Sequence, residues 1–343
     1  MRRITSSRRP SVAVAIIGGV GLLSVACSSH STKNSAPPSF GSSVVSTAVP
    51  TAGPPAAASA RGPGASTAKV VQPDAARPCG VASSGVKYAH VVWILMENKP
   101  LGSVMGSSNA PYENALAARC GQAVDYHGIT NPSLPNYLAA TGGSTFGVTD
   151  DAGPSSHRIA GDSLFGQLDS AGKTWRAYME SIPGNCARSP KSPYAVKHNP
   201  PAYFTALRAS CEKNDVPLER NLDRDIANGT LPSFTFITPN LCNDTHDCSV
   251  RTGDRWLSEW IAKILDGPNY RAGDTVLVLT WDEGNRSDNH IPTIVVAPSV
   301  APGLRVTTRL DHYALLRGTE DLLGLPPLGR AASAPSFATA FKL

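Results

Sequence analysis

Four apolar runs in this chain have the length and composition of buried β-strands. They span residues 90–96, 233–237, 275–281 and 291–297, and those at 90–96 and 275–281 are continuous runs rich in Val, Ile and Leu. Apolar runs without polar alternation are typical of strands that are covered on both faces, as in the middle of a parallel sheet. The pattern therefore predicts a central sheet with helices packed on both of its sides.

Two segments have the spacing of amphipathic helices. Apolar residues between Asp254 and Asp266 recur every three or four positions and form a broad apolar face. A second segment runs from Asp311 to Leu323, where Asp311 is suited to cap the start and Gly324 to end the helix. Strands that alternate with helices imply a mainly parallel sheet, so the predicted fold class is α/β.

Polar pairs follow the two most apolar strand candidates. Glu97 and Asn98 come directly after residues 90–96, and Asp282 and Glu283 come directly after residues 275–281. In an open parallel sheet, ligands bind at the carboxyl ends of the strands. Three carboxylates at one edge repel each other unless a cation lies between them, and a divalent metal is the simplest candidate. The alternative is that each pair is only a polar turn at a strand end.

A serine at the start of a predicted helix is a candidate nucleophile. Pro132 precedes Ser133, and residues 134–140 can form the helix. A serine in this position can simply cap the helix. It can also attack an anionic substrate that is held by metal and by the helix N-terminus. The two roles compete for one hydroxyl oxygen.

A third polar group is the segment Asn243–Asp247, between Cys242 and Cys248. His246 lies among carboxylates and amides there, which fits a general acid or an anion ligand. The alternative is a solvated loop whose aspartates bond their own backbone. His290 is a weaker candidate because it leads into a strand, and we interpret His127 and His312 as structural or surface residues.

The segment from 183 to 217 contains prolines that interrupt any long element, namely Pro183, Pro190, Pro193, Pro200, Pro201 and Pro217. An irregular insertion above the edge of a sheet usually shapes a substrate pocket. We therefore expect this segment to contribute to substrate binding.

The N-terminal segment has the layout of an export signal. Four arginines precede an apolar run at 12–23, which is followed by small residues up to Cys27. Cys27 could carry the lipid of a bacterial lipoprotein, although Ser24 stands where such signals usually have Leu. We therefore predict an export signal at 1–27, and a protein that is either anchored in the cell envelope or secreted.

Residues 28–77 are dense in Ser, Ala, Pro, Thr and Gly and are predicted to form a disordered tether. Residues 78–343 are predicted to be one catalytic domain. The net charge of +5 partly reflects the arginines of the signal. No basic run with interleaved aromatic residues points to nucleic acid, and membrane attachment is expected only through lipid on Cys27. The sequence does not indicate an oligomeric state.

Six cysteines remain when Cys27 is set aside. An even number in an exported chain indicates disulfides, and six cysteines allow 15 pairings. Nearness in sequence favours three pairs, Cys79 with Cys120, Cys186 with Cys211, and Cys242 with Cys248. A thiolate zinc site is the alternative, but the chain has no C-x-x-C pair.

Five short motifs occur in an order that resembles one family. They are Met-Glu-Asn at 96–98, Pro-Ser-Leu-Pro-Asn-Tyr at 132–137, Asn-Asp-x-His-Asp at 243–247, Thr-Trp-Asp-Glu at 280–283 and Ile-Pro-Thr at 291–293. Each motif by itself is weak evidence for a family, but five motifs in this order are specific. The chain resembles the bacterial phosphoesterase family of secreted acid phosphatases and phospholipases C, from about residue 88 to residue 325.

The resemblance implies an alkaline-phosphatase-like fold and hydrolysis of phosphate esters through a phosphoserine intermediate. Carried over to this chain, it implies that Ser133 attacks phosphorus and that His246 binds the phosphoryl group or protonates the leaving oxygen. It also implies a set of metal ligands and a set of phosphate contacts. The metal ligands would be Glu97, Asn98, Asp282 and Glu283, and the phosphate contacts would be Asn136, Asp244, Asp247 and His290.

Two positions depart from the family pattern. Asn131 stands where relatives commonly have His, and Lys99 stands where they commonly have Arg. A lysine keeps the charge but not the bidentate geometry of a guanidinium. The expected consequence is a different pH optimum or phosphate contact rather than a loss of activity.

Our first hypothesis is an exported, metal-dependent phosphomonoesterase of acid phosphatase type that acts on small phosphate esters. The runner-up is a phosphodiesterase of phospholipase C type, which the same residues would serve. A third hypothesis is an inactive envelope lipoprotein that uses the domain for binding. The oxygen ligands favour calcium, magnesium or manganese, whereas relatives of alkaline phosphatase also use zinc and iron.

Overall fold

The computed structural model describes residues 71–83, 85–284 and 288–343. The predicted export signal and most of the predicted tether lie outside these residues. Residues 74–77, at the end of the predicted tether, bond to the folded domain. Ala75 N donates to Asp266 Oδ1 at 3.2 Å, and Arg119 Nη1 donates to Ala75 O at 2.8 Å.

An eight-stranded sheet forms the centre of the domain, in the order β5-β4-β6-β1-β7-β8-β2-β9. Within it β8 is antiparallel to both of its neighbours, and the other described pairs are parallel. The strands are β1 (His90–Met96), β2 (Gly121–Ala123), β4 (Trp175–Met179), β5 (Asp215–Pro217), β6 (Phe234–Thr238), β7 (Thr275–Trp281), β8 (Thr293–Val296) and β9 (Leu304–Val306). Two short strands, β3 (Tyr126–His127) and β10 (Leu310–Asp311), pair separately. The predicted α/β fold class is confirmed.

The core lies along the central strands. All seven residues of β7 are buried, and so are Val91 to Met96 of β1. Trp93 of β1 packs edge-on against Phe234 of β6, with ring centroids 4.9 Å apart. The apolar runs at 90–96 and 275–281 were thus correctly read as strands covered on both faces. β8 begins at Thr293, two residues later than predicted, because Pro292 has no N–H to donate to the sheet.

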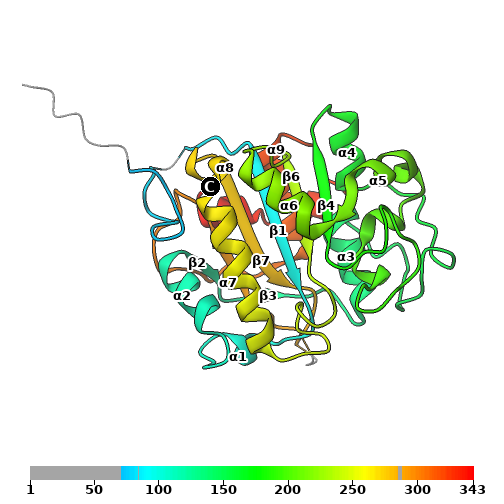
Figure 1. The fold of residues 1–343 in the computed structure, drawn as a ribbon, viewed down its shortest axis with the longest axis horizontal. Coiled ribbons are helices and arrows are strands. Elements are labelled where there is room, and N and C mark those ends of the chain that lie inside the picture. Colours follow the sequence, from blue (N-terminus) through cyan, green and yellow to red (C-terminus); the bar gives the residue numbers. More distant parts are fainter. Residues whose placement is uncertain (1–70, 84, 285–287) are drawn as a thin grey trace, which may run out of the picture. The chain divides into compact units, whose positions relative to one another are not determined.

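Helices cover both faces of the sheet, as Figure 1 shows for α7 on the near face and α9 on the far face. Helix α7 (Val250–Asp266) begins four residues earlier than its apolar pattern, because the Ser249 side chain caps it by accepting from Thr252 N. Helix α9 (His312–Leu323) has the predicted ends. Asp311 accepts from Ala314 N at 2.9 Å, and Gly324 is left-handed with φ 66°.

The other helices are shorter. The α-helices are α1 (Leu101–Val104), α2 (Pro111–Arg119), α3 (Ser133–Gly142), α4 (Leu164–Ser170), α5 (Arg208–Asn214), α6 (Leu218–Ala227), α8 (Pro268–Arg271) and α10 (Phe337–Phe341). The 3₁₀ turns are η1 (Val196–His198), η2 (Pro200–Ala202), η3 (Thr205–Leu207) and η4 (Gly329–Ser333). The proline-rich segment from 183 to 217 consists of such short elements, as predicted. No helix among the described residues is long and apolar enough to cross a membrane.

Three disulfides link the cysteine pairs that are nearest in sequence. They join Cys79 to Cys120, Cys186 to Cys211, and Cys242 to Cys248. The predicted pairing is confirmed, and the thiolates are not free to bind zinc. The second disulfide closes the proline-rich segment, and the third closes the loop that carries His246.

Candidate active site

The carboxyl ends of β1, β6 and β7 lie side by side, because β1 pairs with both of the other strands. Glu97 and Asn98 follow β1, Asp282 follows β7, and the 239–248 loop follows β6. Two hydrogen bonds to the backbone of Glu97 tie this loop to the end of β1. Glu97 N donates to Asp244 O at 2.8 Å, and Thr245 Oγ1 donates to Glu97 O at 2.8 Å. The sheet thus brings together residues that are almost 190 positions apart in the chain.

The 239–248 loop is held in a strained backbone conformation beside α7. Thr245 has φ 76°, which a β-branched residue rarely adopts. Its Cγ2 atom lies where Gly253 of α7 has no side chain, and a Cβ there would be 2.4 Å away. Such strain persists only where the surroundings impose it, and it is common at functional sites.

Ser133 is the first residue of α3, and its hydroxyl does not cap the helix. Pro132 occupies the N-cap position instead. The Ser133 hydroxyl donates to Glu97 Oε2 at 3.0 Å, and the side chain is buried. Of the two competing roles, the structure therefore excludes the cap and leaves the hydroxyl directed at the end of β1.

The N-terminus of α3 holds a carboxylate. Leu134 N donates to Asp151 Oδ1 at 2.9 Å, and Lys197 Nζ donates to Asp151 Oδ2 at 2.9 Å. The Asp151 carboxylate therefore occupies an anion site formed by a helix N–H and an ammonium group. Phosphoryl oxygens bind to the same kinds of donor.

Asn136 and Glu283 meet on the opposite side of the helix start. Asn136 Oδ1 accepts from Ile129 N at 2.8 Å and from Thr130 N at 3.1 Å. Its Nδ2 atom donates to Thr130 O at 2.8 Å and to Glu283 Oε2 at 3.2 Å. Asn136 therefore supports the turn before Ser133 and orients Glu283.

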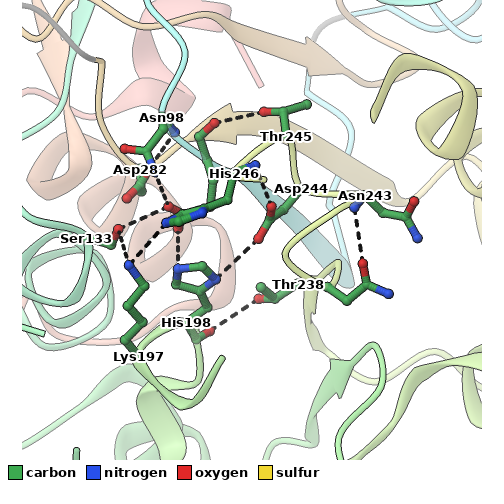
Figure 2. A network of polar contacts seen from close by, with 12 residues as sticks. Asn98, Ser133, Lys197, His198, Thr238, Asn243, Asp244, Thr245, His246 and Asp282 are labelled. Atoms are coloured by element: carbon green, nitrogen blue, oxygen red, sulfur yellow. Dashed lines mark hydrogen bonds and ion pairs between the residues drawn. The ribbon is translucent and has the colours of Figure 1, made fainter. Parts of the chain in front are cut away.

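Lys197 comes from the proline-rich segment, and in Figure 2 its side chain points toward Ser133. Its Nζ atom is 3.5 Å from Ser133 Oγ and 3.4 Å from His246 Nε2. The imidazole of His246 is oriented from its other side, where Nδ1 is 2.6 Å from Asp247 Oδ1. His246 N also donates to Asp244 Oδ1 at 2.7 Å. The aspartates on both sides of His246 thus position it.

His198 and Tyr137 are buried beside Glu97. His198 Nε2 is 3.0 Å from Glu97 Oε1. Its Nδ1 atom is 3.3 Å from Asp244 Oδ2, and Figure 2 shows the two side chains facing each other. The Tyr137 hydroxyl donates to Glu97 Oε1 at 2.7 Å, and its ring stacks on that of His198. Burial, and then the positive charge of Lys197, hold the pKa of His198 well below its usual range, so this histidine is neutral.

The buried carboxylates raise each other's proton affinity. Burial, followed by the charges of Asp282 and Asp244, raises the pKa of Glu97 well above its usual range. Burial likewise raises the pKa of Asp282 to about 7 and that of Glu283 to about 8. The pKa of Lys197 is raised because Asp151 and Glu97 outweigh the effect of its own burial. Lys99 also feels the charges of Asp244, Glu97 and Asp282, so two lysines face a larger number of buried carboxylates.

The residues at the edge of the sheet fit a divalent metal. Asp282 Oδ2, Asp244 Oδ2 and His198 Nε2 are buried and have no hydrogen-bond partner among the described residues. His198 lies close to Glu97 and Asp244, but neither contact is a hydrogen bond. An orphaned carboxylate oxygen among several buried carboxylates is stabilised by a cation. The donor set is mainly oxygen, which suits calcium, magnesium or manganese.

A second cluster of metal-binding residue types lies elsewhere. Asp125, His127 and His290 can each offer a ligand atom within 4.8 Å of the others, which is compatible with a divalent metal. His127 Nδ1 is 2.7 Å from Asp288 O, and His290 Nε2 is 2.9 Å from Val124 O. The guanidinium of Arg309 lies 3.0 Å from His127 Nε2 and 3.7 Å from Asp125 Oδ1. The structure thus groups His290 with His127 rather than with the Ser133 network.

Sequence reasoning missed four residues of the site, Tyr137, Asp151, Lys197 and His198. Lys197 and His198 stand side by side in the proline-rich segment that was predicted to shape a substrate pocket. A histidine next to a lysine in such a segment was a usable signal. Asp151 carried no signal, because nothing local distinguishes it from the neighbouring Asp150.

The sequence profile of the Phosphoesterase family matches residues 93–326. The chain belongs to the phosphoesterase family. This match runs from β1, the strand that leads into Glu97, to just beyond α9. It includes each of the residues described above for the Ser133 network.

Other members of the phosphoesterase family are similar to this chain over most of its folded part. A protein of Mycobacterium tuberculosis named phosphatidylinositol-3-phosphatase is 35% identical over 262 residues, which are 75% of this chain and 84% of that protein. An acid phosphatase of Aspergillus fumigatus is 29% identical and a probable acid phosphatase of Kluyveromyces lactis is 30% identical, each over 72% of this chain. The chain spans 57% and 61% of these two fungal proteins. Family and relatives place it among the phosphoric monoester hydrolases.

Solved structures support the fold of this phosphoesterase. A Vibrio parahaemolyticus protein of the alkaline phosphatase superfamily has a TM-score of 0.51 at 14% identity, over 79% of this chain and 74% of that one. A lipoteichoic acid synthase of Listeria monocytogenes has the same TM-score at 12% identity, over 71% of this chain and 74% of that one. The predicted alkaline-phosphatase-like fold is confirmed.

Proposed function

We propose that this protein is an exported, metal-dependent phosphomonoesterase of acid phosphatase type that works through a phosphoserine intermediate. The observation that carries the proposal is the position of Ser133. Its buried hydroxyl stands at the N-terminus of α3, free of any capping role, 3.0 Å from Glu97 and 3.5 Å from Lys197. A hydroxyl beside an anion site and a cation is suited to attack a bound phosphoryl group.

The first half-reaction transfers the phosphoryl group to the enzyme. The phosphoryl oxygens bind at the N-terminus of α3 and Lys197, the site at which Asp151 now accepts hydrogen bonds. Ser133 passes its proton to Glu97 Oε2, to which it is hydrogen-bonded, and its Oγ forms a bond to phosphorus while the ester P–O bond breaks. His246 is the group that protonates the leaving alkoxide, so the alcohol departs neutral.

The second half-reaction releases inorganic phosphate. Water attacks the phosphoserine and its proton passes to His246. The Oγ–P bond breaks, and Ser133 takes its proton back from Glu97. Asp247 lies 2.6 Å from His246 Nδ1 and keeps the imidazole oriented through both steps. Charge on the phosphoryl oxygens is balanced by Lys197 and by the helix N–H groups.

A divalent cation would be held by Glu97, Asn98, Asp282 and Glu283, with Asp244 close by. When bound, it would stabilise the Ser133 alkoxide and the negative charge of the phosphoryl group. The donor set favours calcium, magnesium or manganese, and zinc or iron remain alternatives. The three unpartnered buried atoms of the site support this assignment.

The three disulfides support export, because such bonds persist in oxidising compartments. We therefore retain the predicted signal at 1–27 and the lipid on Cys27 as parts of the proposal. Mass spectrometry of the mature N-terminus tests both. A mature chain that begins at an unmodified residue would exclude the lipid anchor, and an intact Met1 would exclude cleavage of a signal.

Chelation followed by addition of single metals tests the enzyme itself. The full chain is stripped with a chelator and then assayed on an aryl phosphate monoester and an aryl phosphate diester. We expect monoester hydrolysis to disappear with the metal and to return with one of the hard divalent cations. Undiminished hydrolysis by metal-free protein would exclude metal dependence. Preferential cleavage of the diester would favour the phospholipase C alternative. No hydrolysis by folded, metal-loaded protein would favour the hypothesis of an inactive lipoprotein that uses the domain for binding.

A further inference from the structure

A cleft of about 340 Å³ opens directly beside the Ser133 network. Three of its lining residues, Asp151, Lys197 and His246, belong to that network. One wall comes from the proline-rich segment and includes Tyr194 and Val196. Leu241 of the 239–248 loop also lines the cleft. The cleft therefore begins where the phosphoryl group is proposed to bind and where His246 meets the leaving oxygen.

Beyond the three network residues, the cleft is lined mainly by carbon. Pro190, Ala195, Val196 and Leu241 have no polar side-chain atoms. Ser192 and Tyr194 have one hydroxyl each, and that of Tyr194 is engaged elsewhere, since it donates to Ala187 O at 2.8 Å and accepts from Asn199 Nδ2 at 2.9 Å. A group in the cleft would thus meet charged atoms at one end and apolar atoms along the rest.

The walls of the cleft are joined to each other and to the core. Leu241 N donates to Pro193 O at 3.0 Å, which links the 239–248 loop to the proline-rich segment. Each of these two segments is closed by its own disulfide. Tyr194 and Val196 are buried, 3% and 4% exposed. The cleft is therefore formed before substrate binds, as is usual for small-molecule sites.

We propose that this cleft is the leaving-group subsite and that it selects phosphate monoesters whose alcohol is apolar, such as an aryl group or an acyl chain. The proposal rests on the proposed function. Apolar surface that leaves water in the cleft favours binding, whereas hydroxyl groups placed there would lose their hydrogen bonds to water. The volume is at the lower end of the roughly 300–1,000 Å³ of small-ligand pockets, so it holds one ring system or part of a chain.

Two substitutions test the cleft without touching the catalytic residues. Leu241→Ser removes apolar surface at a partly exposed position, and Ala195→Trp fills the cleft from the proline-rich segment. The matched controls are Leu322→Ser on α9, at a partly exposed leucine, and Ala206→Trp, which lines a separate cleft of about 620 Å³. The full chain is assayed with naphthyl phosphate, with a short-chain lysophosphatidate kept below its micelle concentration, and with glycerol 2-phosphate.

We expect Leu241→Ser to lower kcat/KM for naphthyl phosphate about fivefold and Ala195→Trp to lower it roughly tenfold or more, because such pockets discriminate to about this degree. Turnover of glycerol 2-phosphate should stay within about twofold, and the controls should leave both substrates unchanged. A matching loss with the lysophosphatidate would identify an acyl chain as an occupant. A loss confined to naphthyl phosphate would identify an aryl group.

The outcomes separate this proposal from the proposed function. If wild-type protein hydrolyses all substrates and both cleft variants leave the naphthyl-to-glycerol ratio of kcat/KM unchanged, the subsite is wrong and the function stands. An equal loss on all substrates would also overturn the subsite, because it would indicate damage to the catalytic residues. If folded, metal-loaded wild type hydrolyses none of them, the proposed function fails and the subsite fails with it.

Discussion

Two clusters of acidic and histidine residues in this molecule are similar in composition and differ in charge balance. Around His127, both imidazoles lie close to backbone carbonyls, and Arg309 lies 3.7 Å from the Asp125 carboxylate. Around Glu97, several carboxylates are buried together, and unpartnered oxygen atoms remain on Asp244 and Asp282. The candidate ligand atoms of the His127 cluster lie closer together, but the positive charge of Arg309 already balances the Asp125 carboxylate.

The comparison teaches that short distances between potential ligand atoms are a weaker sign of function than buried charges that no neighbouring group balances. Charges are costly to bury unless they are paired, so a protein retains an unpaired set only where something else binds. The Glu97 site also has a nucleophile candidate and an anion site at hand, and the His127 cluster has neither among its described contacts. The following predictions set the two clusters against each other.

The largest effect is expected from Ser133→Ala. Loss of the nucleophile should lower kcat by about 10⁴-fold or more, as is typical when such a residue is removed. The matched control is Ser163→Ala, which removes another buried serine, one that does cap a helix, by accepting from Gly166 N at 3.2 Å. That change should cost about 1 kcal/mol of stability and leave kcat unchanged. Urea unfolding measures the stability of both variants. Wild-type turnover in Ser133→Ala would exclude Ser133 as the nucleophile.

A second test makes one chemical change in both clusters. Asp282→Asn should lower kcat/KM about a hundredfold or more and reduce bound metal, because a buried anionic ligand is lost. Asp125→Asn should leave activity within about twofold, since that carboxylate is partly exposed and has its own cation. Kinetics and elemental analysis of bound metal measure both. Equal losses in the two variants would show that the clusters do not differ as proposed.

The two cations can be compared in the same way. Lys197→Met should lower kcat/KM about a hundredfold, because phosphoryl charge would lose its nearest ammonium group. Arg309→Met should have less than about a twofold effect, since the Arg309 side chain is 70% exposed and its described contacts are with the His127 cluster. Steady-state kinetics on an aryl phosphate decides. An unchanged kcat/KM in Lys197→Met would show that Lys197 has no part in the mechanism.

The smallest effect concerns Glu113, a buried carboxylate that belongs to neither cluster. Burial, and then the charge of Asp254, raises the pKa of Glu113 to about 9. The folded protein therefore holds a proton that the unfolded chain releases near its usual pKa of 4.5. Between these values the unfolded chain binds fewer protons, so the contribution of Glu113 is complete at low pH and falls as the pH rises.

Glu113→Gln should abolish this loss. Relative to wild type, the variant should gain stability by up to roughly 1.4 kcal/mol for each pH unit between about pH 5 and pH 8. Urea unfolding at several pH values measures the difference. A constant difference across this range would show that Glu113 is ionised in the folded protein.

Much of the fold was predictable, because strands buried on both faces leave a strong local pattern. The runs at 90–96 and 275–281 became β1 and β7 with the predicted ends. The ends of β8 and α7 were less predictable. They depend on Pro292, which cannot donate a hydrogen bond, and on Ser249, whose side chain supplies a cap outside the apolar pattern.

The candidate site was predictable where its residues follow the predicted strands. Glu97, Asn98, Asp282 and Glu283 were found because each pair directly follows an apolar run. Asp151 and Tyr137 were not found, since neither has a local pattern that marks it. Asp151 reaches the site only because it lies near the start of α3, and Tyr137 only because one face of α3 is turned toward β1.

By itself, the sequence determined the α/β class, the strands that lead to the carboxylates and the family, because each of these leaves a local or ordered signal. It favoured the disulfide pairs, and the structure decided them. The tertiary structure alone decided which oxygens lack partners, that Ser133 is not a cap, and that Lys197 and His198 join the site whereas His290 joins Asp125. The physical reason is that charge balance and hydrogen bonding depend on distances between segments far apart in the chain. No local pattern records those distances.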